Sequence, residues 1–176
     1  MSATEPSEQF EQIVMPHLDA AYNLARWLAG NDHDAEDIAQ EACLRAFRFL
    51  GGFRGGNSRS WLLSIVRNTA YTWLKQNRPQ AVVSIGDEEL SEIEDPAALK
   101  NHTSALHHAD RDVLQGALES LPVEFREALI LRELEGMSYK EIADIADVPI
   151  GTVMSRLARA RKLLQEYLGP KGEVKK

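Results

Sequence analysis

Residues 138–161 place hydroxyl and guanidinium side chains at helical spacing, a combination that can bind DNA. The segment predicts a short helix, a tight turn and a second helix starting near Ile150. One side of the second helix presents Thr152, Ser155, Arg159 and Lys162, with Arg156 at its edge. Arginine can bond guanine edges bidentately in the major groove, and hydroxyls and lysine can bind phosphates. The pattern predicts a helix-turn-helix unit; the alternative is a helical hairpin with a solvated basic face.

Short sequence patterns mark where the two helices of this unit begin and end. Ser138 and Glu141 have the spacing of a capping box, in which a hydroxyl and a carboxylate satisfy free backbone N–H groups at a helix start. Asp147 occupies the turn, and aspartate tolerates the left-handed conformation better than most residues. Pro149 cannot continue the first helix but fits the first turn of the next. The second helix is expected to bury one apolar stripe, made of Ile150, Val153, Leu157, Ala160 and Leu164.

The formal net charge of −7 is unevenly distributed along the 176 residues. Residues 1–41 contain nine acidic residues and one basic residue, whereas residues 42–86 contain seven basic residues and no acidic one. Residues 87–112 contain eight acidic residues and two basic ones, and residues 150–176 contain seven basic residues and two acidic ones. Two basic blocks separated by acidic segments predict two anion-binding surfaces.

The composition favours a soluble cytoplasmic protein without a cofactor. No run resembles a transmembrane span or a secretory signal. The single cysteine, Cys43, provides neither an intrachain disulfide nor a multi-cysteine zinc site. His102, His107 and His108, with Asp110, lack a compelling metal-ligand spacing and are expected to be linker residues. An enzyme is the least favoured class, because no nucleophile–base pair or phosphate-binding loop is recognisable.

The N-terminal half predicts three helices. The first covers residues 10–29, with Pro16 kinking or opening it, and the second runs from Asp32 or Asp34 to about Leu50. The second helix is expected to bury Ile38, Ala42 and Phe49 or nearby positions. Another of its faces is shared by Asp37, Gln40, Glu41, Leu44 and Arg45. That face is either solvated or a docking surface for a basic partner helix, with leucine as the apolar anchor.

A glycine-rich loop over residues 51–60 precedes the third helix, at residues 61–75. Four glycines within six positions are incompatible with a stable helix interior, and neither the Walker spacing nor a preceding strand is present. Basic side chains on this loop, beside Phe53 and Trp61, are suited to hold a splayed single-stranded base. Trp73 is expected in the core, whereas either role is open for Trp61. The third helix also carries a polar stripe of Arg67, Asn68, Tyr71 and Lys75.

Residues 79–109 are predicted to be an acidic linker, because proline, glycine and acidic residues interrupt the apolar periodicity. Two further helices are then expected, from Asp110 to Leu121 and from Val123 to Glu135, where Gly136 ends the second. The sequence therefore predicts an all-α chain with two small helical domains.

The order of these features resembles bacterial RNA polymerase sigma factors of the extracytoplasmic-function (ECF) class across about residues 8–168. Four segments carry the resemblance: residues 34–42 (DAEDIAQEA), 53–68, 121–129 and 139–161. It implies a sigma two-like domain at residues 8–78, a flexible linker at 79–109 and a sigma four-like helix-turn-helix domain at 110–170, without the middle domain of larger factors.

The resemblance also implies what each surface binds. The second helix is implied to dock on the beta-prime coiled coil of core RNA polymerase through Asp37, Gln40, Glu41 and Leu44. The loop and third helix are implied to open the minus-ten element of promoter DNA through Arg54, Asn57, Ser58, Arg59, Trp61 and Asn68. The recognition helix is implied to contact the minus-thirty-five element through Thr152, Ser155, Arg156 and Arg159. The C-terminal domain is implied to contact the polymerase beta flap.

A promoter-specificity subunit in a stress or envelope response, masked by a dedicated anti-sigma factor, is the function that the resemblance implies. The alternative is a stand-alone helix-turn-helix regulator. It explains residues 121–165 but neither the acid-free block at 42–86 nor the docking face, and such regulators usually dimerise on DNA. Met154 stands where many relatives have lysine, which removes one phosphate contact.

Overall fold

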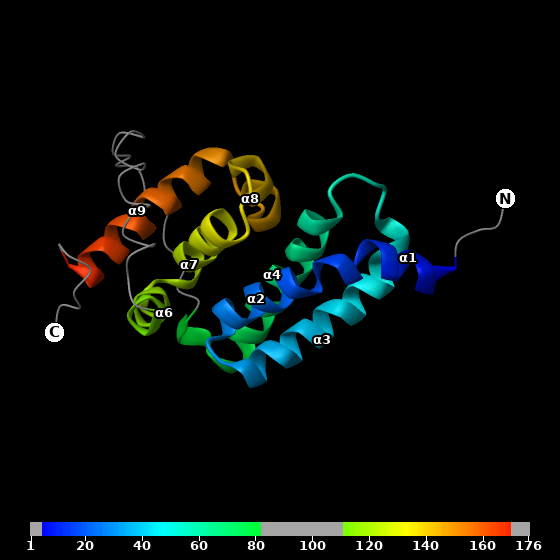
Figure 1. The fold of residues 1–176 in the computed structure, drawn as a ribbon, viewed down its shortest axis with the longest axis horizontal. Helices are drawn as coiled ribbons and strands as arrows, with labels where there is room; N and C mark the ends of the chain where they lie inside the picture. The colour runs from blue at the N-terminus through cyan, green and yellow to red at the C-terminus, as the bar shows by residue number, and fades with distance from the viewer. Residues whose placement is uncertain (1–4, 82–110, 170–176) are drawn as a thin grey trace. The chain divides into compact units, whose positions relative to one another are not determined.

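The computed structural model describes residues 5–81 and 111–169, and within these two ranges every regular element is a helix (Figure 1). The helices up to residue 81 belong to one compact unit, and α6, α7 and α9 belong to another. Of the expected linker, only a 3-10 turn at Pro79–Ala81 is described, and residues 82–109 lie outside the described ranges. The all-α prediction is confirmed.

Three long helices form the body of the first unit: α2 (Leu18–Ala29), α3 (Asp32–Phe49) and α4 (Ser58–Asn77). A short helix, α1 (Pro6–Ile13), precedes them. Short 3-10 turns follow α1, α3 and α4, at Met15–His17 (η1), Leu50–Gly52 (η2) and Pro79–Ala81 (η3). Each of α2, α3 and α4 packs against the other two (Figure 1). This arrangement leaves one side of α3 outside the bundle.

Local signals set the boundaries of these helices. Pro16 lies in η1, so the break predicted between α1 and α2 is confirmed. Gly30 ends α2 with φ +90°, a left-handed conformation that glycine adopts without a steric penalty. Asn31 caps α3, because its side-chain oxygen accepts a hydrogen bond from the backbone N–H of Asp34 at 2.9 Å.

Apolar side chains from α2, α3 and α4 form the core of the first unit. The largest fully buried ones are Leu24, Leu28, Ile38, Leu62, Leu63 and Leu74. Ala42 is also buried, as expected, but Phe49 is 60% exposed and the neighbouring Leu50 takes the buried place. Tyr71, predicted to lie on a polar stripe of α4, is buried instead. The guanidinium of Arg67 lies 3.9 Å from the centroid of its ring. Trp73, expected in the core, is half-buried.

The second unit contains α6 (Arg111–Ser120), α7 (Val123–Leu129), a π-helical turn η6 (Ile130–Leu134) and α9 (Ile150–Leu168), and α8 (Tyr139–Ala146) immediately precedes α9. α9 packs against both α6 and α7. The helix expected from Val123 to Glu135 changes its hydrogen bonding at Ile130, whose carbonyl accepts from the N–H of Glu135 at 3.1 Å. Gly136 ends this helix as predicted, with φ +64°.

Candidate nucleic-acid interface

The local signals predicted for the helix-turn-helix unit are present at α8 and α9. Ser138 Oγ accepts the backbone N–H of Glu141 at 3.1 Å, and Glu141 Oε1 accepts that of Ser138 at 3.0 Å, which is a complete capping box. Asp147 adopts the left-handed conformation with φ +55°. The N–H of Val148 donates to the carbonyl of Ala143 at 3.1 Å and closes the turn.

α9 buries the stripe predicted for it, with one exception. Val153, Leu157, Ala160 and Leu164 are buried. Ile150 is 45% exposed, so its expected burial is wrong. It is the first residue of α9, directly after the turn at Pro149, and the buried stripe begins one turn later.

The four residues predicted to contact the minus-thirty-five element differ in exposure. Thr152 and Arg159 are partly exposed, whereas Ser155 and Arg156 are buried, with 7% and 8% of their surface exposed. Ser155 Oγ donates to the carbonyl of Gly151 at 3.0 Å. The expectation that Ser155 stands on the free side of the helix is wrong, and Arg156, expected at the edge of that side, is buried as well.

Two ion pairs connect α9 to the segment formed by α7 and η6. Arg156 Nη2 lies 3.6 Å from Glu124 Oε2 on α7, and Arg161 Nη2 lies 2.6 Å from Glu133 Oε1 on η6. Sequence reasoning missed both carboxylates. The Arg161 pair joins residues 28 positions apart, and no local pattern relates residues at such a separation.

The glycine-rich loop turns the chain between α3 and α4. Gly55 and Gly56 have φ of +87° and +91°, a conformation that disfavours any residue with a side chain. Arg54 is exposed beside them. The rings of Phe53 and Trp61 lie with centroids 5.1 Å apart, and both residues are half-buried. The loop therefore presents a cation next to an aromatic pair.

Two of the predicted minus-ten residues, Asn57 and Ser58, make hydrogen bonds within the protein at the start of α4. Asn57 caps α4, its Oδ1 accepting the N–H of Ser60 at 3.1 Å. Ser58 Oγ lies 3.0 Å from Nε2 of His17, which is 41 positions earlier in the chain. Sequence reasoning missed His17, since a lone histidine in a turn has no distinguishing spacing.

The remaining minus-ten residues lie along α4. Arg59 is partly exposed in its first turn, and Asn68 is exposed further on. Asn68 Oδ1 accepts a hydrogen bond from Nη1 of Arg67 at 3.3 Å. The acid-free block thus gives the loop and α4 a cationic surface.

α3 carries the predicted docking face on the side that the bundle leaves uncovered. Asp37, Gln40 and Leu44 are exposed, with 55% of the surface of Leu44 accessible. Glu41 is partly exposed and accepts from Nε of Arg45 at 3.1 Å. The spacing i, i+3, i+4, i+7 puts the four predicted residues on one face.

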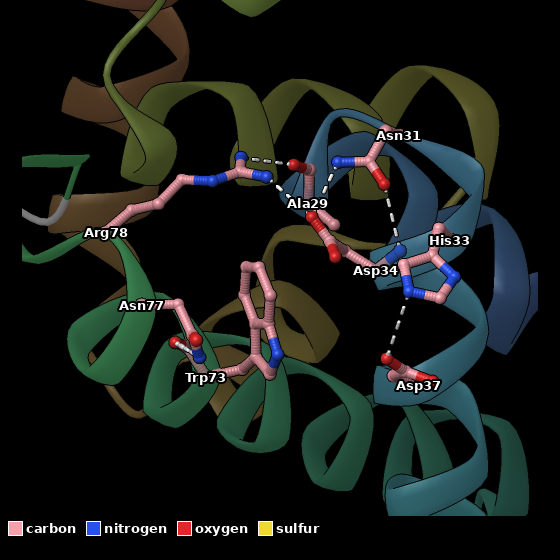
Figure 2. Close-up of polar contacts among 8 residues, drawn as sticks. All are labelled: Ala29, Asn31, His33, Asp34, Asp37, Trp73, Asn77 and Arg78. Atoms are coloured by element: carbon pink, nitrogen blue, oxygen red, sulfur yellow. Dashed lines mark hydrogen bonds and ion pairs between the residues drawn. The ribbon is translucent and has the colours of Figure 1, made fainter.

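Two further contacts border this face. His33 Nε2 lies 4.0 Å from Asp37 Oδ2, one turn along the exposed side of α3 (Figure 2). Phe47 is 48% exposed, and its ring packs edge-on against that of Phe10 with centroids 5.7 Å apart. The face is therefore acidic toward the start of α3 and apolar toward its end.

Burial and neighbouring charge shift two pKa values in the first unit. Burial raises the pKa of the Cys43 thiol. Desolvation, followed by the charge of Asp32, raises the pKa of Tyr22, whose hydroxyl donates to Asp32 Oδ1 at 3.3 Å. Neither group is among the predicted nucleic-acid contacts.

Within residues 5–81 and 111–169, no group of three or more histidine, cysteine or acidic side chains is arranged to hold a metal ion. The linker histidines at 102, 107 and 108 and Asp110 lie outside those ranges. The described helices include none with the length and apolar character needed to cross a membrane.

Two family models match this chain in the predicted order. Residues 13–80 match the model described as Sigma-70 region 2, and residues 111–164 match Sigma-70, region 4. The ECF RNA polymerase sigma factor SigE of Mycolicibacterium smegmatis is 39% identical over 162 residues, covering 90% of this chain and 61% of that relative. This chain therefore spans about three fifths of the length of SigE.

Shorter relatives match over most of their own length. The RNA polymerase sigma-H factor of Pseudomonas aeruginosa is 35% identical over 174 residues, covering 92% of this chain and 86% of that one. The ECF RNA polymerase sigma-E factor of Escherichia coli K12 is 38% identical over 143 residues, covering 78% and 75%. The sigma factor RpoE of Bartonella quintana, solved in complex with the anti-sigma factor NepR, matches with a TM-score of 0.68 and 28% identity, covering 89% and 94%.

The two matched regions coincide with the two sets of helices. The P. aeruginosa and E. coli relatives, which match 92% and 78% of this chain, are sigma factors. Sigma factors are promoter-specificity subunits without enzymatic activity, so neither an enzyme nor a stand-alone regulator is favoured. The chain belongs to the extracytoplasmic-function sigma factors of bacterial RNA polymerase.

Proposed function

We propose that this chain directs core RNA polymerase to a set of promoters through three surfaces. Residues 8–78 form the domain that docks on polymerase and opens the minus-ten element, residues 79–109 form the linker, and residues 110–170 form the minus-thirty-five domain. The observation that carries the proposal is the uncovered side of α3, where acidic side chains adjoin the exposed Leu44. Exposed apolar side chains rimmed by charge mark interaction surfaces.

Docking on the beta-prime coiled coil uses the α3 face. Asp37 and Glu41 supply negative charge for a basic helix, Gln40 supplies hydrogen bonds, and Leu44 supplies the apolar anchor. The opposite side of α3 contributes Ile38 and Ala42 to the core, so the docking residues are held on a rigid element.

Opening of the minus-ten element uses the glycine loop and α4. Trp61 and Phe53 provide an aromatic surface for an unstacked base, and Arg54 and Arg59 neutralise phosphates. Asn57, Ser58 and Asn68 supply polar groups for the exposed strand. The bend at Gly55 and Gly56 supports this role, because it turns the loop without bulky side chains.

Recognition of the minus-thirty-five element uses the first half of α9 in the major groove. Arg159 is suited to bond a guanine edge bidentately, and Thr152 to contact a phosphate or a base edge. Ser155 and Arg156, the other two predicted contacts, lie deeper in the helix packing. The same domain contacts the beta flap.

Control by an anti-sigma factor and action in the cytoplasm complete the proposal. The B. quintana sigma factor RpoE has been solved with the anti-sigma factor NepR bound to it. We infer that a partner of this kind covers the α3 face of this chain and releases it in a stress or envelope response. The cytoplasm is where a bacterium keeps its core polymerase and promoters.

Binding to core RNA polymerase tests the docking face directly. Asp37→Arg reverses a charge on the proposed face, and Asp19→Arg makes the same change at an exposed carboxylate in the first turn of α2, on a different helix. We expect pull-down or titration to show that Asp37→Arg weakens binding about tenfold or more, while Asp19→Arg binds like wild type. Circular dichroism checks that both variants fold.

Two outcomes would contradict the proposal at different levels. Unchanged affinity of the Asp37→Arg variant would remove this face as the docking site. Failure of the wild-type chain to bind core polymerase would remove the sigma function itself, provided that no inhibitor has co-purified with it.

A further inference from the structure

Arg156 is one of two arginines on α9 whose charged groups turn inward. The Arg156 side chain is 9% exposed and its partner Glu124 15%, and the corresponding values are 5% for Arg161 and 20% for Glu133. Both carboxylates come from the segment formed by α7 and η6, and α7 packs directly against α9. The recognition helix is therefore attached to its support by charge at two levels.

These pairs are poorly suited to add stability. Taking a guanidinium and a carboxylate out of water is costly, and close pairing offsets this cost only when the remaining donors also find partners. Nε of Arg156 and Nε of Arg161 are buried without a hydrogen-bond partner. An apolar pair of similar size is expected to be at least as stable, so stability alone does not explain charge at these positions.

The two ion pairs can restrain the orientation of α9. Arg156 and Arg161 are five residues apart, which places their Cα atoms about 7.5 Å apart along the axis and on different sides of the helix. Two separate attachments restrain both the tilt of a helix and its rotation about its own axis. A bidentate base contact requires its donors within hydrogen-bonding distance of two acceptors, so it depends on that rotation.

We propose that Glu124 is a positioning residue for promoter recognition, which acts by holding Arg156 and thereby setting the rotation of α9. Arg156 is then a positioning residue as well, not a base contact, and Arg159 and Thr152 are the groups that meet the DNA. The inference rests on the proposed minus-thirty-five function. It replaces the direct role that the sequence assigns to Arg156 with an indirect one.

A double-mutant cycle tests this proposal in the full chain bound to core polymerase. Glu124→Gln, Arg156→Met and the double variant are compared with wild type, and Glu166→Gln serves as a matched control at an exposed carboxylate of α9. Affinity is measured for a promoter and for each single base-pair substitution of its minus-thirty-five element. A second template with a premelted minus-ten region and no minus-thirty-five element monitors docking.

We expect either single variant to lose about tenfold in affinity for the promoter and to discriminate less at every minus-thirty-five position. The double variant should bind the promoter no more weakly than the single variant with the lower affinity, because the two changes break the same interaction. Glu166→Gln should match wild type, and all variants should bind the second template equally. Glu124→Asp, which keeps the charge but shortens the side chain, should fold and show an intermediate loss.

The pattern across base pairs separates the two roles of Arg156. If Arg156→Met abolishes discrimination at a single base pair while Glu124→Gln keeps the wild-type profile, Arg156 is a base contact and the proposal is wrong. Wild-type profiles in both single variants would overturn it too. If wild-type protein binds polymerase but discriminates at no minus-thirty-five position, the proposed function of α9 fails, and this inference fails with it.

Discussion

Arg78 Nη2 lies 2.7 Å from Asp34 Oδ2, and this ion pair joins the residue after α4 to the first turn of α3 (Figure 2). Nη1 of the same guanidinium donates to the carbonyl of Ala29, the last residue of α2, at 2.6 Å. One side chain therefore connects α2, α3 and the end of α4. Its guanidinium also lies 5.2 Å from the centroid of the Trp73 ring.

Arg78→Ala should lower the free energy of unfolding of the first unit by about 1–2 kcal/mol. The variant loses a hydrogen bond to a backbone carbonyl and a partly exposed ion pair, for which modest values are typical. Chemical denaturation followed by tryptophan fluorescence measures the change. Lys75→Ala, at an exposed position of the last turn of α4, should stay within about 0.5 kcal/mol of wild type. Equal stability of the two variants would contradict a joining role for Arg78.

Ser138→Ala should destabilise α8 by about 1 kcal/mol, because it removes the acceptor for the N–H of Glu141. Adding Glu141→Ala should cost less than the sum of the single changes, since the two caps form one structure. Thermal unfolding of the single and double variants measures both effects. Lys140→Ala, exposed in the same turn, is the control, and a loss as large as that of Ser138→Ala would argue against the capping box as the cause.

Arg159→Ala should cost about 1–3 kcal/mol of promoter affinity and relax discrimination at one base pair of the minus-thirty-five element. Lys162→Ala should instead weaken binding evenly for all sequences and reduce the salt dependence by about one counterion. Titrations of holoenzyme with promoter variants at several salt concentrations distinguish the two effects. A uniform loss for Arg159→Ala would make this residue a phosphate contact.

Cys43 should react slowly with iodoacetamide in the native state, because burial raises its pKa and the thiolate is the reactive form. As the single cysteine, it reports without interference from other thiols. The stabilisation of the neutral thiol is complete below the ordinary pKa and is lost as pH rises through the raised value. Relative to Cys43→Ser, the wild-type chain should therefore lose stability under alkaline conditions. Native labelling as fast as labelling in denaturant would contradict this.

Features that depend on residues a few positions apart could be predicted from the amino-acid sequence alone. The capping box at Ser138 and Glu141, the left-handed turn at Asp147 and the helix end at Gly136 all lie where the sequence places them. Each follows from hydrogen bonds or backbone sterics within a single turn of chain, so no knowledge of packing is required. The resemblance to the family likewise came from four short segments in order, at residues 34–42, 53–68, 121–129 and 139–161.

Which side chains are buried, and how the charged ones pair, depends on the packing of the helices and could not be predicted from the sequence. A helical pattern shows that Arg156 lies at the edge of a polar side, but not that α7 covers that edge and brings Glu124 to it. The exposure of Ile150 and Phe49 and the burial of Tyr71 likewise depend on where neighbouring elements begin and end. The pairing of Arg78 with Asp34 bridges 44 positions. Contacts at such separations depend on the packing of whole helices, which periodicity along one helix does not contain.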